Sequence, residues 1–359
     1  METGLSRRTF LGATAAGLVA PRLVLPEQDE PKVGWAILGL GGYATRQIMP
    51  SFKDCRRSKL VALISGTPDK LRRYGEQYAI PESHRYAYDA LEKIKDNPDI
   101  QVVYVVTPPG NHREFTERSA AAGKHVCCEK PMAPTAADCQ AMIDACKKAG
   151  KLLQIGYRSH YEAHNLRAIE ACRSELGRLR SITSDHGFNM PNGTWRTQRR
   201  WSGGGSMMDI GIYSVQALCY LAGEDPTEVT AAISNPPGDD RFKEVEDTVH
   251  FRLAFPSGVL ATGTSGYSWR SGANRYHVIA ERGGLRAEPA TAYGGHRLDI
   301  NGQAAQVTPN NQFAAQMDHL SEAILNKSDV KTPGEMGLRD IRIIQAIYES
   351  AKTGRPVKI

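Results

Sequence analysis

The chain has 359 residues, enough for two domains with separate cores. Hydrophobic residues make up 41% and charged residues 23%, which is typical of a globular protein and excludes a disordered or fibrous chain. The net charge of +6 is spread along the sequence apart from "RTQRR" at 196–200, so we predict no nucleic-acid partner.

The first thirty residues are predicted to be an export signal and linker. Arg7 and Arg8 precede an apolar run, "TFLGATAAGLVA", that ends in small residues, as twin-arginine signals do. The run is too short to cross a bilayer, so we expect no membrane span. The alternative is a disordered basic tail. We expect residues 1–30 to direct the folded protein to the periplasm.

The seven cysteines have no spacing that suggests a zinc site or a disulfide framework. A protein that folds in a reducing compartment keeps its cysteines as buried thiols. We therefore predict buried thiols and no metal.

Residues 32–44, "KVGWAILGLGGYA", combine an apolar strand with a glycine-rich turn. Gly39, Gly41 and Ala44 match the dinucleotide pattern G-x-G-x-x-G/A, in which the glycines permit a tight turn and a close approach of the backbone to a pyrophosphate. A helix near 44–53 and a second strand, "KLVALIS", follow, and that context makes the pattern informative. We predict a dinucleotide site that includes Gly39, Gly41, Gly42 and Tyr43.

The residues after the second strand favour NADP over NAD. NAD sites place an acidic residue there, whereas this chain has Ser65-Gly66-Thr67 followed by Lys70. A carboxylate would repel the 2′-phosphate of NADP, while hydroxyls and a lysine would accept it. Asp69 is expected in the first turn of the next helix, where acids are favoured. We predict Ser65, Gly66 and Lys70 as NADP contacts, although Lys70 could instead be a solvated helix lysine.

A third strand, "IQVVYVV", ends in "TPPGNH", and ligands bind at such carboxyl ends in parallel sheets. A helix at 112–122, the strand "KHVCCE", a helix at 135–149 and the strand "LLQIGY" complete a doubly wound domain of six parallel strands, expected over 31–157. Lys130 follows "KHVCCE", and Pro131 fixes the turn, with a cis bond that would aim the lysine inward. The alternative is a surface lysine.

The spacing of hydrophobic residues along the sequence changes in the second half of the chain. A helix near 162–175 precedes the alternating runs "LRSITSDHGF", "TEVTAAIS", "DTVHFRLAF", "GVLATGTSGYS" and "RYHVIAERGGLRAE". Turn residues separate these runs, which indicates an antiparallel sheet. Helices return near 207–222, 312–325 and 336–353. We expect 158–359 to form an α+β domain with a largely antiparallel open sheet, whose last helices pack on the first domain.

The stretch "GGGSMMDIGIYS", residues 203–214, places Asp209 and Tyr213 on one helix face. Ser206 and Asp209 also form an S-x-x-D pattern, so Asp209 could simply cap the helix while Tyr213 packs one turn later. The three glycines would let a ligand approach the helix N-terminus. The residues alone leave both interpretations open.

The order of these motifs resembles the Gfo/Idh/MocA oxidoreductase family, and within it the glucose-fructose oxidoreductase branch. The resemblance rests on "GKHVCCEKPMA" at 123, "GYRSHYEAHN" at 156, "GGGSMMDIGIYS" at 203, "NQFAAQMDHLSEAI" at 311 and "IQAIYESAKTGRPV" at 344. Many members carry histidine at the position of Tyr213, and tyrosine is typical of the glucose-fructose branch. The resemblance implies Lys130 and Tyr213 as catalytic residues. It also implies cofactor neighbours at Tyr88, Thr107, Pro108, His112, Glu129, Arg158, Trp195, Arg196 and Tyr293.

The chemistry of sugar oxidation explains why a lysine and a tyrosine would be paired. A free phenol, with a pKa near ~10, is a poor base at neutral pH. A neighbouring ammonium stabilises the phenolate. We therefore predict Tyr213 as the acid/base, Lys130 as its activator and Asp209 as the group that orients substrate or lysine. For the other aromatic residues and arginines, core packing and solvation are the alternatives, and His112 could cap its helix.

The resemblance implies a sugar oxidoreductase that keeps NADP bound, oxidises one aldose to a lactone and reduces a second sugar. Two alternatives are a conventional NAD(P)-dependent sugar dehydrogenase that exchanges free cofactor and an NAD-dependent glycosidase acting by transient oxidation. A non-catalytic sugar sensor is a further alternative, against which Lys130 and Tyr213 argue. A homo-oligomer, dimer or tetramer, is expected by analogy. Only the short "PEQDEPK" stands where the glucose-fructose branch has a long arm, which leaves cofactor retention and a tetramer open.

Overall fold

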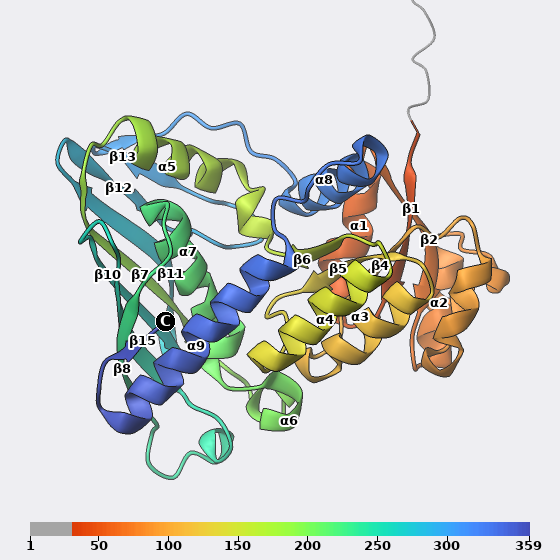
Figure 1. The fold of residues 1–359 in the computed structure, drawn as a ribbon, viewed down its shortest axis with the longest axis horizontal. Coiled ribbons are helices and arrows are strands. Elements are labelled where there is room, and N and C mark those ends of the chain that lie inside the picture. Colours follow the sequence, from red (N-terminus) through yellow and green to blue (C-terminus); the bar gives the residue numbers. More distant parts are fainter. Residues whose placement is uncertain (1–30) are drawn as a thin grey trace, which may run out of the picture. The chain divides into compact units, whose positions relative to one another are not determined.

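The computed structural model describes residues 31–359, and the predicted export signal at 1–30 lies outside the described residues. Residues 32–359 form one compact unit that contains two β-sheets (Figure 1). Within the described part of the chain, no helix is both long and apolar enough to cross a membrane.

The first sheet has six strands in the order β3-β2-β1-β4-β5-β6, all parallel. This order reverses direction between β1 and β4, as in dinucleotide-binding folds. Helices cover both faces, so β1 and β4 are fully buried. The predicted doubly wound sheet is confirmed. The strands are β1 (Val33–Leu38), β2 (Ser58–Ile64), β3 (Arg85–Tyr86), β4 (Val102–Val105), β5 (His125–Glu129) and β6 (Leu153–Gly156).

The sequence motifs marked five of these six strands, because β3 pairs through only two residues and has no hydrophobic run. The helix expected near 44–53 is present but irregular. It consists of a π-helical turn (Ala44–Ile48), α1 (Met49–Ser51) and a 3₁₀ turn (Phe52–Asp54). Pro50 lacks the N–H that a regular helix would need there, which accounts for the irregularity. The other helices of this half are α2 (Pro68–Gln77), α3 (His112–Ala121) and α4 (Ala136–Lys148).

The second sheet has nine strands in the order β14-β13-β12-β11-β7-β10-β9-β8-β15, antiparallel except for the β7–β10 pair. The predicted α+β half with a largely antiparallel sheet is therefore confirmed. The run "RYHVIAERGGLRAE" forms a hairpin between β11 and β12 rather than one strand. The strands are β7 (Leu179–Asn189), β8 (Glu228–Ser234), β9 (Thr248–Ala254), β10 (Leu260–Gly266), β11 (Ser268–Ala280), β12 (Gly283–Ala287), β13 (Leu298–Ile300), β14 (Gln303–Ala304) and β15 (Val357–Lys358).

Helices α5, α7 and α9 lie on one face of the nine-stranded sheet (Figure 1). Helix α8 instead packs on the parallel sheet, where Trp35 Nε1 donates to Ser321 Oγ (2.9 Å) and Ser58 Oγ donates to Asp318 Oδ1 (2.8 Å). Helix α9 also contacts α4 and β6. The helices of this half are α5 (Ala163–Ser174), α6 (Arg199–Ser202), α7 (Ile212–Ala222), α8 (Gln312–Asn326) and α9 (Gly334–Thr353).

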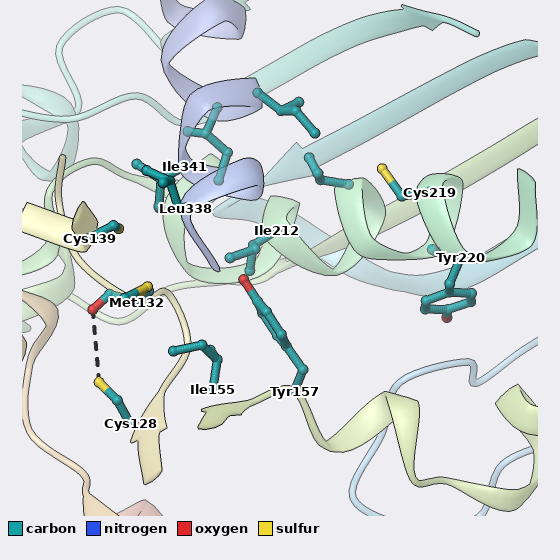
Figure 2. Close-up of a cluster of buried hydrophobic side chains, with 14 of the residues drawn as sticks. Cys128, Met132, Cys139, Ile155, Tyr157, Ile212, Cys219, Tyr220, Leu338 and Ile341 are labelled. Atoms are coloured by element: carbon teal, nitrogen blue, oxygen red, sulfur yellow. Dashed lines mark hydrogen bonds between the residues drawn. The ribbon is translucent and has the colours of Figure 1, made fainter. Parts of the chain in front are cut away.

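A continuous hydrophobic core joins the two sheets. Figure 2 shows side chains from β5, β6 and α4 meeting those of α7 and α9: Cys128, Ile155, Cys139, Ile212, Cys219, Leu338 and Ile341. All seven cysteines lie in the described residues and are buried and free, as predicted. Burial raises the pKa of the Cys139 thiol to about 12, so it is unreactive. This shared core fixes the end of β5 against α7, the two elements that carry Lys130 and Tyr213.

Candidate active site

The glycine turn after β1 has the geometry that a dinucleotide requires. Gly39 has φ +99°, and a Cβ there would lie 2.5 Å from the carbonyl oxygen of Val106, so only glycine fits. This contact lies where β1 and β4 end, at the point where the strand order reverses. A Cβ at Gly41 would have no atom within 4 Å, which leaves its backbone open to approach. Tyr43 packs against Phe313, with ring centroids 6.1 Å apart.

The loop after β4 offers a polar group toward the same edge of the sheet. Thr107 Oγ1 is buried and has no hydrogen-bond partner among the described residues, and Pro108 follows it. A buried hydroxyl of this kind normally has a partner, so Thr107 fits a site that a ligand completes. With the open backbone at Gly41, this shows that the residues present suit a nicotinamide dinucleotide.

His112 lies behind this loop. Its Nε2 is 2.8 Å from Thr107 O and its Nδ1 is 3.1 Å from Pro131 O, so the ring joins the loops after β4 and β5. Burial lowers the pKa of His112 and outweighs the carbonyl contacts, which raise it. The interpretation of His112 as a helix cap is wrong, because Asn111 is the N-cap residue of α3.

The end of β2 has the residues expected for NADP. Ser65 Oγ accepts from Thr67 N (3.2 Å), and a Cβ at Gly66 would lie 2.9 Å from the ring of Tyr88. Lys70 is exposed on α2. Asp69 lies in the first turn of α2 and pairs with Arg72 (3.0 Å), which confirms its predicted place.

Lys130 points inward from the turn after β5. The Lys130–Pro131 bond is cis, as predicted, and the alternative of a surface lysine is wrong because the side chain is 12% exposed. Its Nζ donates to the carbonyl oxygen of Asp209 (2.5 Å) and lies 4.6 Å from the ring centroid of Tyr213. Burial by itself lowers the pKa of the Lys130 ammonium, but Tyr213 and Asp209 outweigh burial and raise it. Lys130 is therefore a cation between a carboxylate and a phenol ring.

Asp209 is an ionised carboxylate that accepts hydrogen bonds from several donors. Its Oδ2 accepts from Arg196 Nε (2.9 Å) and from Tyr267 OH (2.8 Å), and its Oδ1 lies 3.4 Å from Lys130 Nζ. Burial would raise the pKa of Asp209, but Lys130 and Arg196 outweigh burial and lower the pKa to about 2. Asp209 thus holds the lysine by charge at any working pH.

The capping interpretation of Asp209 is wrong. Ser206 makes no side-chain cap and instead bonds Ser265 Oγ at 2.9 Å. The N-terminus of the helical segment 207–222 is covered by the buried carboxylate of Glu246, which accepts from Gly205 N (2.9 Å) and Met207 N (3.0 Å). The sequence contains no signal for this role, because Glu246 lies in a distant loop.

The three glycines before this helix serve packing and not ligand approach. A Cβ at Gly205 would lie 1.9 Å from Glu246 O, and one at Gly204 would lie 2.2 Å from Tyr348 OH. Gly203 has φ +78° and ends α6. The expectation that a ligand reaches the helix N-terminus through these glycines is therefore wrong.

Arg158, just after β6, contacts the hydroxyl of Tyr213. Its Nη2 donates to Tyr213 OH (3.0 Å) and to Thr291 O (2.6 Å), and its Nη1 donates to Ala292 O (2.8 Å) and Gln312 Oε1 (2.7 Å). The side chain is 2% exposed. The phenol therefore has a fixed guanidinium on its oxygen and the Lys130 ammonium on its ring face. The sequence suggested only the ammonium.

His186 of β7 stacks near the ring of Tyr213, with ring centroids 5.7 Å apart. Its nitrogens lie 2.9 Å from Ser214 Oγ and 2.8 Å from Thr291 Oγ1. Burial, together with the nearby Arg158 and Lys130, lowers the pKa of His186 to about 3. This histidine is therefore neutral and does not compete with Tyr213 for protons.

The structure divides the predicted site residues between two places. Gly39 and Gly41 follow β1 and Lys130 follows β5, and the segment 207–222 brings Asp209 and Tyr213 to Lys130. Ser65, Gly66, Lys70 and Tyr88 lie at the end of β2 and beyond. Which of them touch cofactor stays a prediction.

Four of the predicted cofactor neighbours make contacts with other side chains of the protein. Glu129 accepts from Tyr104 OH (2.5 Å), and burial raises its pKa. The Arg196 guanidinium lies 4.5 Å from the ring centroid of Trp195. Tyr293 is 53% exposed, and its ring centroid lies 4.8 Å from the Arg158 guanidinium and 5.7 Å from that of Tyr43.

Comparisons with known proteins agree with this geometry. Residues 33–157 match the model of an oxidoreductase family with an NAD-binding Rossmann fold, and residues 168–286 match the GFO/IDH/MocA C-terminal domain. D-xylose 1-dehydrogenase (NADP(+)) 2 of Haloferax volcanii is 27% identical over 333 residues, 90% of this chain and 99% of the relative. The 1,5-anhydro-D-fructose reductase of Ensifer adhaerens is 25% identical, covering 90% of this chain and 98% of the relative.

A solved structure is more similar still. The aldose-aldose oxidoreductase of Caulobacter crescentus, complexed with glycerol, superimposes with a TM-score of 0.89 at 53% identity. The match covers 91% of this chain and 100% of that one. An agreement of this extent, with both domain types found in the same order, shows that the chain is an NAD(P)-dependent oxidoreductase and belongs to the Gfo/Idh/MocA oxidoreductase family.

Proposed function

We propose that this oxidoreductase retains NADP(H), oxidises the anomeric hydroxyl of one aldose to a lactone and reduces a second sugar with the same cofactor. The observation that carries the proposal is the phenol of Tyr213 between two cations, with Arg158 on its oxygen and Lys130 on its ring. Sugars are the substrates named for three of its relatives, among them the aldose-aldose enzyme at 53% identity.

The side chains around Tyr213 perform the proton transfer. A bound nicotinamide supplies the hydride acceptor and donor at the sugar carbon. Tyr213 takes the proton of the anomeric hydroxyl and returns it to the carbonyl oxygen of the second sugar, which balances the two half-reactions. Lys130 and Arg158 stabilise the phenolate by charge. Asp209, anchored by Arg196 and Tyr267, holds the ammonium in place.

The test uses the full chain purified without added nucleotide. Adding an aldose is expected to produce the absorbance band of reduced nicotinamide, and adding a second sugar is expected to remove it. Activity only with added NADP would contradict a retained cofactor and would favour a conventional dehydrogenase, the activity named for the Haloferax relative. Cleavage of chromogenic glycosides without net redox change would instead indicate a glycosidase.

The proposed preference for NADP depends on the residues after β2. Lys70→Ala is expected to weaken NADP binding by about 10-fold and to leave NAD binding nearly unchanged, because it removes a cation near the 2′-phosphate. Titration of cofactor-free protein with each nucleotide measures this. Arg73→Ala, an exposed cation on the same helix, is the matched control. An equal loss for both nucleotides would contradict the assignment of Lys70.

We also propose that the enzyme acts in the periplasm. The support is the Arg7-Arg8 motif before an apolar run. Retention of cofactor suits that place, because both half-reactions then need no external nucleotide.

A homo-oligomer is proposed through the face of the nine-stranded sheet that α5, α7 and α9 leave uncovered. Leu260 on β10 and Ile279 on β11 both pair with Ser181 of β7 and are 55% and 50% exposed, so two large apolar side chains flank Ser181 on the same face of the sheet. Apolar patches of this kind commonly mark interfaces.

A further inference from the structure

We propose that Glu162, His164 and His296 form a binding site for a divalent transition-metal ion beside the N-terminus of α5. Each residue offers one ligand atom, and the three atoms lie within 4.8 Å of one another. Two imidazoles and one carboxylate are a donor set that binds Zn²⁺ and Co²⁺. The three side chains are 2%, 12% and 6% exposed, so the cluster is largely buried, and water reaching the partly exposed histidines would complete the coordination.

The carboxylate is already oriented for this role. Glu162 Oε2 accepts from Asn165 N (2.8 Å) and from Asn165 Nδ2 (2.9 Å). Asn165 Oδ1 in turn accepts from Tyr220 OH (3.1 Å) and Tyr276 OH (2.9 Å), so the whole arrangement is rigid. Outer hydrogen bonds of this kind fix metal-binding carboxylates. The other oxygen, Oε1, is left facing the two histidines, 2.8 Å from His164 Nδ1 and 3.5 Å from His296 Nδ1.

His296 provides an independent observation. Its Nε2 is buried and has no hydrogen-bond partner among the described residues. A buried imidazole nitrogen without a partner is costly, and structures normally satisfy it. An ion bound through Nε2 would supply the missing interaction, whereas an ion bound through Nδ1, the nitrogen that faces Glu162 Oε1, would leave it to water. The sequence could not indicate this site, because His296 comes from a segment far along the chain from Glu162 and His164.

The site also has a place in the architecture of the catalytic residues. His296 belongs to residues 288–297, between β12 and β13. The same segment provides the carbonyl oxygens of Thr291 and Ala292 that accept from Arg158, the residue that contacts Tyr213 OH. An ion would fasten this segment to α5 behind Arg158, without contact with the reacting atoms.

The test is a metal titration of the full-length chain without an affinity tag, treated first with a chelator. Co²⁺ is the probe, because its visible d–d bands report the ligand geometry. We expect about one ion per chain with the bands of a low-coordinate site, and displacement of Co²⁺ by Zn²⁺. A saturating excess of Zn²⁺ is expected to raise the unfolding temperature by about 5 °C.

Two ligand variants and one control complete the experiment. His164→Ala and His296→Ala are each expected to weaken Co²⁺ binding by more than about 100-fold, beyond the loss typical of outer-shell changes. His277→Ala, which removes an exposed histidine on β11, is expected to bind as the wild type does. Circular dichroism of the metal-free variants checks that they fold. The proposal is overturned if the folded wild type shows no stoichiometric Co²⁺ bands, or if His164→Ala binds Co²⁺ as tightly as the wild type.

Discussion

Tyr213→Phe is expected to lower turnover by about 10²-fold or more while the chain keeps its fold and its cofactor. The substitution removes only the hydroxyl. The ring that contacts Lys130 and His186 remains, and Arg158 keeps three other acceptors, so the surrounding packing does not change. Single-turnover kinetics with an aldose, monitored by nicotinamide absorbance, measures the effect on the chemical step.

Tyr78→Phe is the matched control for this experiment. Tyr78 lies at the end of α2, half-buried and away from the catalytic residues. Its substitution by phenylalanine removes the same hydroxyl group as Tyr213→Phe does. Its turnover should equal that of the wild type. If Tyr213→Phe also turned over at nearly the wild-type rate, the assignment of Tyr213 as the proton-transfer group would be refuted.

Lys130→Met is expected to lower kcat by about 10² to 10³-fold. Methionine keeps most of the side-chain volume but removes the ammonium that lies 4.6 Å from the Tyr213 ring centroid and bonds Asp209. The phenolate then loses one of its two stabilising cations, and Asp209 keeps only Arg196 and Tyr267.

Steady-state kinetics of Lys130→Met and of Lys93→Met, an exposed lysine of the same half of the chain, check this prediction. Lys93→Met should have the kcat of the wild type. A Lys130→Met variant that changed only the KM for sugar, with kcat intact, would show that the ammonium binds substrate and does not assist proton transfer.

Local patterns were sufficient for most of the fold. The turn at Gly39 could be predicted because its backbone requires glycine, and the helix at 207–222 could be predicted because a long, largely apolar run ends at Gly223, which has φ +77°. The strand β3 could not be predicted, because two residues held only by a neighbouring strand leave no pattern. The prediction that Lys130 pairs with Asp209 and Tyr213 came from the family resemblance, because Lys130 lies in a different domain from the other two residues.

The sequence by itself determined the two kinds of sheet, the glycine turn, the inward cis turn at Lys130 and the shared helix face of Asp209 and Tyr213, because each depends on neighbours within a few residues. Only the tertiary structure determined which charged and polar groups contact one another. It placed Arg158 on the hydroxyl of Tyr213, Glu246 over the helix N-terminus, and His296 beside Glu162. These contacts join residues from distant segments, and the packing of the two sheets on one core determines their distances.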